Sequence, residues 1–257
     1  MLSSVGLLRP VYRGWERVRA ARYAGGDVVA DDGLPVPPPH LIVRVAGTPD
    51  PRWFLESGQL AAESIRGVLE RAERPLESVG SLLDFGCGCG RVLRNWSSHG
   101  GDVAGSDLSG DAIQWCRANL LFARFETNNL APPLAFDDAS FELAYGLSVF
   151  THLPAAMQHD WMDELRRVVA PDGLLLLSLH GEHYLDRLGP EEAAQFDAGE
   201  LVVRWGEVPG TNLCTTFHPR EWVHANLLPH GFEEVAFVAE GAKGNPHQDL
   251  YLLRRAG

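Results

Sequence analysis

The fold of this 257-residue chain is decided by the stretch Leu82-Leu83-Asp84-Phe85-Gly86-Cys87-Gly88-Cys89-Gly90-Arg91-Val92-Leu93-Arg94. The pattern is typical of a strand that ends near Asp84, a turn made by glycines at alternate positions, and a helix that begins at Val92. Glycine lets a backbone turn sharply and approach a ligand closely. The free N–H groups of the helix's first turn would face that ligand. The stretch therefore predicts a loop that binds a nucleotide-like molecule.

Spacing narrows the choice of ligand. A dinucleotide-binding fingerprint needs Gly or Ala three residues after its second glycine, but Arg91 stands three residues after Gly88. A phosphate-binding P-loop needs Gly-Lys-Ser/Thr, and the only lysine of the chain is Lys243. The first mismatch weakens the case for NAD, and the second excludes an ATPase of the P-loop type.

A second motif follows the first at the end of the next expected strand. The run Asp-x-Gly-x-Gly-x-Gly at 84–90 is followed by an acidic residue, Asp107, at the end of the next expected strand. Together these closely resemble class I S-adenosylmethionine-dependent methyltransferases. Shorter pieces at 137–143, 148–153 and 171–175 extend the resemblance over about residues 55–181. It implies a Rossmann-like α/β fold, a doubly wound and mainly parallel seven-stranded sheet with an antiparallel final strand.

Periodicity places the other elements. Apolar residues at spacings of three and four predict a helix over 57–74, and alternation of strands with helices predicts a parallel sheet. A short loop at 240–248 predicts the antiparallel hairpin that distinguishes methyltransferases from NAD-binding domains. The expected strands after the first are 102–106, 123–127, 142–149, 174–179, 232–239 and 250–253, with a helix over 219–228 and a further strand pair at 200–205 and 213–217.

Charge and composition limit the partners. The formal net charge of −12 argues against a nucleic-acid surface, which needs clustered Lys and Arg. The chain has no apolar run of about 18 residues, so we expect no membrane span. The apolar run at 5–8 is too short for a signal peptide, and we expect a cytoplasmic protein that is a monomer or a homodimer.

The chain divides into two unequal parts. Residues 1–54 are expected to form a basic arm, with charge +4 over 1–23, and a proline-rich linker. The arm either packs on the acidic body or closes over the active site. Residues 55–257 are expected to form the methyltransferase domain, and 181–218 an insertion that binds the methyl acceptor.

The resemblance also assigns cofactor roles. Backbone at Gly86, Gly88 and Gly90 would receive the methionine part, with Phe85 beside it, and backbone at Gly146 could face the methionine ammonium. Asp84 would orient that ammonium group, and Asp107 would bind both ribose hydroxyls. Leu108 and Leu130 would sandwich the adenine, and Asn129, with Asn128 as second choice, would hydrogen-bond its exocyclic nitrogen.

Catalysis needs the acceptor in line with the methyl group and, where a proton must leave, a base. His152 and His183 follow two neighbouring strands, and each is a candidate base because the ordinary pKa of histidine lies near neutrality. Tyr184 and Trp222 could form a wall of the acceptor site. The alternative for His152 is a hydrogen bond to the backbone that fixes its loop.

We expect no metal site. Cys87 and Cys89 lack a second pair to complete a tetrahedral zinc site, so we interpret them as small fillers of the loop. A polar group follows the fifth expected strand, with His218 opposite it: His180, Glu182, His183 and Asp186. A chain with ten histidines produces such close spacings by chance, so we do not interpret this group as a metal site.

The sequence thus predicts a methyltransferase that uses S-adenosylmethionine, leaves S-adenosylhomocysteine and methylates a small molecule. Two alternatives stay open: a noncatalytic S-adenosylmethionine-binding protein, and a NAD-dependent oxidoreductase. The atom methylated is not predicted.

Overall fold

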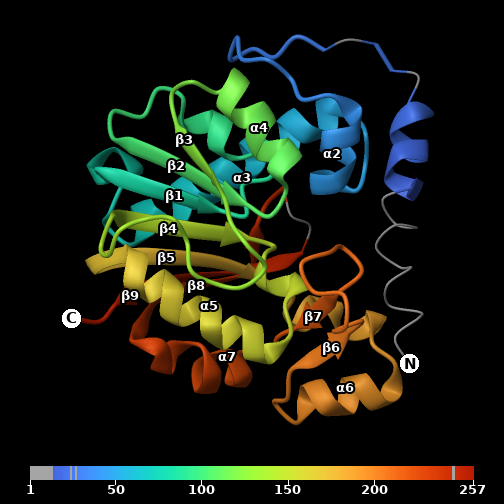
Figure 1. Ribbon diagram of the computed structural model, residues 1–257. Helices are drawn as coiled ribbons and strands as arrows, with labels where there is room; N and C mark the ends of the chain where they lie inside the picture. The colour runs from blue at the N-terminus through green and yellow to red at the C-terminus, as the bar shows by residue number, and fades with distance from the viewer. Residues whose placement is uncertain (1–13, 24, 27, 245–246) are drawn as a thin grey trace.

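A seven-stranded sheet forms the centre of the computed structural model, which describes residues 14–23, 25–26, 28–244 and 247–257 (Figure 1). The strand order is β3-β2-β1-β4-β5-β9-β8. The strands are β1 (Ser81–Phe85), β2 (Asp102–Asp107), β3 (Arg124–Thr127), β4 (Phe141–Leu147), β5 (Val169–Leu179), β8 (Phe232–Ala242) and β9 (Gln248–Arg255).

The pairing confirms the predicted topology. Strand β1 pairs in parallel with β2 and β4, and β4 pairs in parallel with β5. The last strand, β9, is antiparallel to both β5 and β8. Because the parallel strands end at one edge of the sheet, the loops that follow β1, β2 and β4 lie together, where ligands bind in open α/β folds.

Helices cover both faces of the sheet, with α3 and α4 on one side and α5 and α7 on the other (Figure 1). Successive strand residues point to opposite faces, so Leu82 packs with Ile65 of α3, while Leu83 packs with Trp161 of α5. The α-helices are α2 (Pro39–Ala46), α3 (Pro51–Arg71), α4 (Gly110–Asn119), α5 (Ala155–Val168), α6 (Pro190–Asp197) and α7 (Arg220–Asn226), and the 3₁₀ helices are η1 (Leu76–Ser78), η2 (Leu93–Trp96), η3 (Phe150–His152), η4 (Glu182–Arg187) and η5 (Leu228–His230).

The helix expected after the glycine loop is only the four-residue 3₁₀ helix η2. Asn95 explains the early end, because its side-chain amide donates to the carbonyl of Val92 at 2.9 Å and competes with the main-chain ladder. The buried Arg94 guanidinium in η2 holds Asp32 through two hydrogen bonds of 2.7 and 2.8 Å. The proline-rich segment has no regular structure around Asp32, as expected, and this ion pair holds it against η2, which follows the glycine loop.

The long helix α3 begins earlier than the sequence indicated. Asp50 caps it, accepting the N–H of Arg52 at 3.0 Å, and Pro51 occupies the first turn. The helix therefore runs through residue 54, where the linker was expected to end. Of the basic arm, residues 14–21 are helical, while Arg9 and Arg13 lie outside the described residues. No helix in the described part of the chain is long and apolar enough to cross a membrane.

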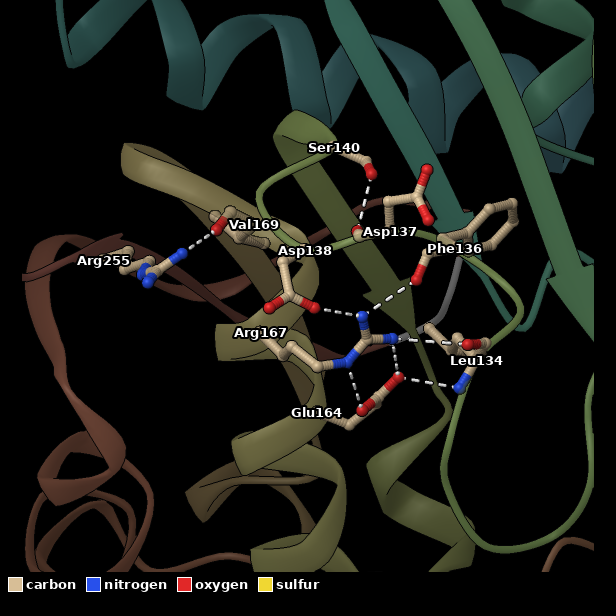
Figure 2. Close-up of polar contacts among 9 residues, drawn as sticks. All are labelled: Leu134, Phe136, Asp137, Asp138, Ser140, Glu164, Arg167, Val169 and Arg255. Atoms are coloured by element: carbon tan, nitrogen blue, oxygen red, sulfur yellow. Dashed lines mark hydrogen bonds and ion pairs between the residues drawn. The ribbon is translucent and has the colours of Figure 1, made fainter.

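Arg167 on α5 fixes the loop between β3 and β4 (Figure 2). Its guanidinium donates to Glu164 at 2.6 Å, to the carbonyl of Phe136 at 2.9 Å and to Asp138 at 2.7 Å. Glu164 in turn accepts the N–H of Leu134 at 2.7 Å. Asp138 and the backbone of Leu134 and Phe136 therefore anchor this loop to α5.

Strands β6 (Val202–Arg204) and β7 (Thr215–Phe217) form a separate antiparallel pair, which confirms the pairing predicted within the insertion. They pack with Tyr184 and Phe196 in a small apolar cluster of their own. The loop that joins the two strands returns to the edge of the main sheet.

Candidate active site

A cavity of about 590 Å³ opens at the carboxyl ends of β1, β2 and β4. The glycine loop and Asp107 form its floor, and residues 209–213 of the insertion line it as well. This volume is in the usual range for small-molecule and cofactor sites.

Two of the three predicted glycines face this cavity. Gly86 and Gly88 have φ of +81° and +55°, the left-handed region that favours glycine. A Cβ at Gly86 would lie 2.4 Å from Val149 Cγ2, and one at Gly88 would lie 2.5 Å from Val45 Cγ2. Gly90 lies behind them against Leu120 and does not line the cavity. Its role is to complete the turn.

The loop cysteines are buried and free, as the filler interpretation expects. Burial raises the pKa of the Cys87 and Cys89 thiols well above the ordinary value. A thiol held in its neutral form is a poor nucleophile and a poor metal ligand. Both side chains therefore serve packing.

Asp107 joins the ends of the first two strands. One carboxylate oxygen accepts the N–H of Gly88 at 2.9 Å, and the other accepts the N–H of Ser109 at 2.7 Å. Burial raises the pKa of this carboxyl, and the two backbone hydrogen bonds oppose the shift. A carboxylate offers about four acceptor positions, so capacity remains for two ligand hydroxyls.

Asp84 lies in the same cavity beside a buried cation. Its side chain is 4% exposed, and burial raises its pKa to about 7. Tyr145 hydrogen-bonds the carboxyl and Arg91 lies near it, and both oppose that shift. Arg91 is itself 7% exposed and donates to Ser57 Oγ at 3.3 Å. An acid and a guanidinium therefore stand together at one end of the cavity.

The residues predicted to hold adenine lie at the other end. Leu108 and Leu130 both line the cavity, and a Cβ at Gly210 would be 2.8 and 2.7 Å from their Cδ1 atoms. Of the two asparagines, Asn129 is exposed, whereas the Oδ1 of Asn128 is buried and lacks a partner among the residues described. An orphaned buried acceptor at a cavity wall is the feature that a ligand donor would satisfy.

Gly146 does not line the cavity, because it lies within β4 between Phe85 and Leu177. Ser148, two residues on, lines it instead and has φ of +60°. Its N–H donates to Ser178 Oγ at 2.8 Å, and its hydroxyl accepts from Gln248 at 2.8 Å. This network holds the strand end in a conformation that only a well-supported residue keeps.

His152 lies at the end of η3 and lines the cavity. Its Nδ1 is 2.7 Å from the carbonyl oxygen of Cys214. A carbonyl oxygen only accepts, so Nδ1 carries the proton and Nε2 carries a free lone pair. Burial lowers the pKa of the ring, which keeps it neutral. Among the described residues, Nε2 has no hydrogen-bond partner, so it remains available as a base.

His183 is not brought to the cavity, contrary to expectation. It is exposed, and its Nδ1 lies 3.1 Å from Glu240 Oε2 at the β8–β9 hairpin. The reason is that η4 turns away from the sheet edge directly after β5. Tyr184 packs with Phe217 inside the insertion, and Trp222 packs in the core beside α5, so neither forms an acceptor wall.

Sequence reasoning missed several residues of the cavity. Arg91 was noticed only as a mismatch to the dinucleotide fingerprint, although its place beside the glycine loop was a usable signal. The others come from distant segments that no local motif marks. They are Glu16, Arg44, Trp53, Ser148, Gly244 and Gln248.

Comparison with known proteins identifies the domain. Residues 82–173 match the family model described as a methyltransferase domain. The matched segment is a methyltransferase domain, and the sheet around it has the fold of class I S-adenosylmethionine-dependent methyltransferases. Its strand order and final antiparallel hairpin agree with that family, whose cofactor is S-adenosylmethionine.

Proteins similar to this chain include other methyltransferases. The chain is 26% identical over 193 residues to malonyl-[acyl-carrier protein] O-methyltransferase of Pectobacterium atrosepticum, a match that covers 73% of this chain and 65% of that relative. A methyltransferase structure from Methanosarcina mazei has a TM-score of 0.53 at 22% identity, covering 68% of this chain and 92% of that one. The glycopeptide N-methyltransferase MtfA bound to S-adenosylmethionine has a TM-score of 0.53 at 17% identity, covering 77% and 87%.

Proposed function

We propose that this protein transfers the methyl group of S-adenosylmethionine to a small-molecule acceptor, with His152 as the general base. The observation that carries the proposal is the hydrogen bond from His152 Nδ1 to the Cys214 carbonyl, which leaves Nε2 unprotonated in the cavity that Asp84 and Asp107 also line. The catalytic unit is residues 55–257 together with the first turn of α3 from Pro51, and Glu16 and Val45 of the preceding segment line one side of the cavity.

We assign a partner in the cavity to each part of the cofactor. Asp107 has acceptor positions left for the two ribose hydroxyls, because a carboxylate offers about four and two of them accept the N–H groups of Gly88 and Ser109. Asp84 would take the methionine ammonium. Arg91 would take the methionine carboxylate, since a guanidinium fork matches a carboxylate in shape and charge. Gly86 and Gly88 leave room for the backbone to approach.

For the adenine we propose Asn128 in place of Asn129. The exocyclic amine of adenine is a donor, and the buried Oδ1 of Asn128 is an acceptor without a partner in the described structure. Its amide nitrogen is already held, donating to the carbonyl of Asn129 at 2.8 Å. Leu108 and Leu130 supply the apolar faces.

When bound, S-adenosylmethionine supplies a methyl carbon made electrophilic by its positive sulfur. His152 then has one task, to accept at Nε2 the proton that the acceptor's O–H or N–H group loses. Nδ1 stays bonded to the Cys214 carbonyl, so the imidazolium keeps its orientation. A positioned base of this kind typically contributes about 10²–10⁴-fold in rate.

A small acceptor is favoured by what surrounds the cavity. Residues 209–213 bound it on the insertion side, and Glu16, Val45 and Trp53 bound it on the side of the N-terminal segment. Gly210 donates to the carbonyl of His152 at 2.9 Å, which ties the insertion to the candidate base. The insertion therefore contacts both the base and the adenine leucines. We infer that it positions acceptor and cofactor together.

Transfer of a labelled methyl group from S-adenosylmethionine to a panel of small alcohols, phenols, amines and carboxylic acids tests the proposal. We expect label in at least one acceptor and inhibition by S-adenosylhomocysteine. Tight S-adenosylhomocysteine binding without transfer to the panel or to a cell extract would favour the noncatalytic alternative. If calorimetry shows that the protein binds NAD and does not bind S-adenosylhomocysteine, the cofactor assignment is overturned.

A further inference from the structure

Outside the cavity, two histidines and a glutamate converge from separate segments. His183 comes from η4, Glu240 from the end of β8, and His247 from the turn that leads into β9. The three offer ligand atoms that all lie within 4.8 Å of one another. They are the one such group of metal-ligating side chains found in the described part of the chain.

The two histidines of this group share one carboxylate oxygen as their hydrogen-bond partner. The two imidazole rings stack in parallel, with centroids 3.8 Å apart and an interplanar angle of 6°. Both Nδ1 atoms face the same carboxylate oxygen, Glu240 Oε2, at 3.1 Å from His183 and 2.6 Å from His247. A carboxylate only accepts, so in the absence of a metal both rings must donate to one oxygen. A divalent cation would replace those protons and use the same three atoms.

The backbone supports this arrangement. Glu240 and His247 both adopt the left-handed conformation, with φ of +49° and +61°. The buried carboxylate of Asp249 accepts the N–H of Glu240 at 2.8 Å and so fixes the main chain beneath the ligand. Such outer contacts orient metal ligands in known sites.

We propose that His183, Glu240 and His247 bind a divalent transition-metal ion of the kind that prefers imidazole, with Zn²⁺ as the representative. Two imidazoles and one carboxylate are a ligand set common for zinc, and three protein ligands leave a position open to water or another oxygen. The ion would connect η4, which begins the insertion, to the β8–β9 hairpin. Two residues of that hairpin, Gly244 and Gln248, line the methyl-transfer cavity, so the metal would hold this side of the cavity in place.

The test is calorimetric titration of the chelator-treated full-length chain with Zn²⁺. We expect one Zn²⁺ per chain, and at least tenfold weaker binding in His183→Ala and in His247→Ala. His224→Ala is the matched control, because His224 is also exposed and pairs with a carboxylate, Glu234, at 2.9 Å but has no second imidazole on that carboxylate. The affinity of the His224→Ala variant for Zn²⁺ should equal that of the wild type.

Titration with Co²⁺ gives an independent signal, since its visible absorption reports nitrogen and oxygen ligands. The band expected in the wild type should be lost in both variants and kept in the control. Circular dichroism shows whether each variant is folded. Absence of stoichiometric binding by the wild type, or equal binding by the wild type and His247→Ala, would overturn the proposal.

Discussion

The carboxylate of Asp107 accepts the N–H of Gly88 at 2.9 Å, so the acid at the end of β2 holds the loop that follows β1. The two halves of the sequence motif are therefore one unit in the structure. Any ligand on Asp107 therefore also lies against the glycine loop.

Replacement of Asp107 by Ala should weaken S-adenosylmethionine binding by about 2–3 kcal/mol, because charge-assisted hydrogen bonds to two hydroxyls are lost. Isothermal titration calorimetry measures this. Asp102→Ala at the start of the same strand is the control, since Asp102 is exposed, pairs with Arg124 at 2.7 Å and lies far from the loop. Affinities equal within twofold for Asp107→Ala and the wild type would remove Asp107 from the ribose site.

Binding of S-adenosylmethionine should weaken as the pH falls below 7. Burial raises the pKa of Asp84 to about 7 in the free protein, so the carboxyl takes up a proton below that pH. A cationic ammonium favours the carboxylate form, and the proton must leave on binding. We expect a roughly fivefold loss of affinity between pH 7 and pH 6. The dependence should vanish in Asp84→Asn, and a wild-type affinity that is flat over this range would show that Asp84 does not meet the ammonium.

Two glycines of α3 should respond in opposite ways to alanine. A Cβ at Gly58 would lie 2.1 Å from the carbonyl oxygen of Arg91, so Gly58→Ala must push the helix from the glycine loop and should lower the free energy of unfolding by about 1–3 kcal/mol. Gly67 faces open space on the same helix, and Gly67→Ala should raise that free energy by about 0.5–1 kcal/mol. Urea denaturation compares the two. A neutral Gly58→Ala would mean that α3 does not support the loop.

Loss of Arg167 should destabilise the loop that precedes β4. Arg167→Ala removes the cation from the buried Glu164 and the donors from two backbone carbonyls (Figure 2). We expect a loss of about 2–4 kcal/mol in unfolding free energy. The exposed pair of Arg254 with Glu233 is the control, and Arg254→Ala should cost less than about 1 kcal/mol. Equal effects from the two variants would show that the loop does not depend on Arg167.

The sheet could be predicted because each of its determinants is local. The glycine run needs positive φ, the apolar run at 174–179 is covered on both faces, and the hairpin at 240–248 reverses the last strand. The cofactor side of the cavity follows from the same local signals, since Asp84 and Asp107 stand at strand ends. The helix expected after the glycine loop is shorter than the sequence indicated, because a single side chain, Asn95, competes for the backbone carbonyl of Val92.

The acceptor side could not be predicted in the same way. It is built from segments far apart in the chain, and nothing in the sequence states that residues 209–213 return to the cavity while η4 turns away from it. His152 and His183 therefore looked equivalent, and only the fold separates them. The partner of His183, Glu240, lies 57 residues further along the chain, a distance over which no spacing rule applies.

The rate of methyl transfer by His152→Ala, at saturating S-adenosylmethionine and with an acceptor identified from the panel, tests the proposed chemistry. We predict a fall of about 10²-fold or more, with cofactor affinity unchanged within twofold and partial recovery on adding imidazole. His159→Ala on α5, outside the cavity, should keep the wild-type rate. A His152→Ala enzyme that transfers methyl groups within about threefold of the wild-type rate would contradict the assignment of His152 as the base.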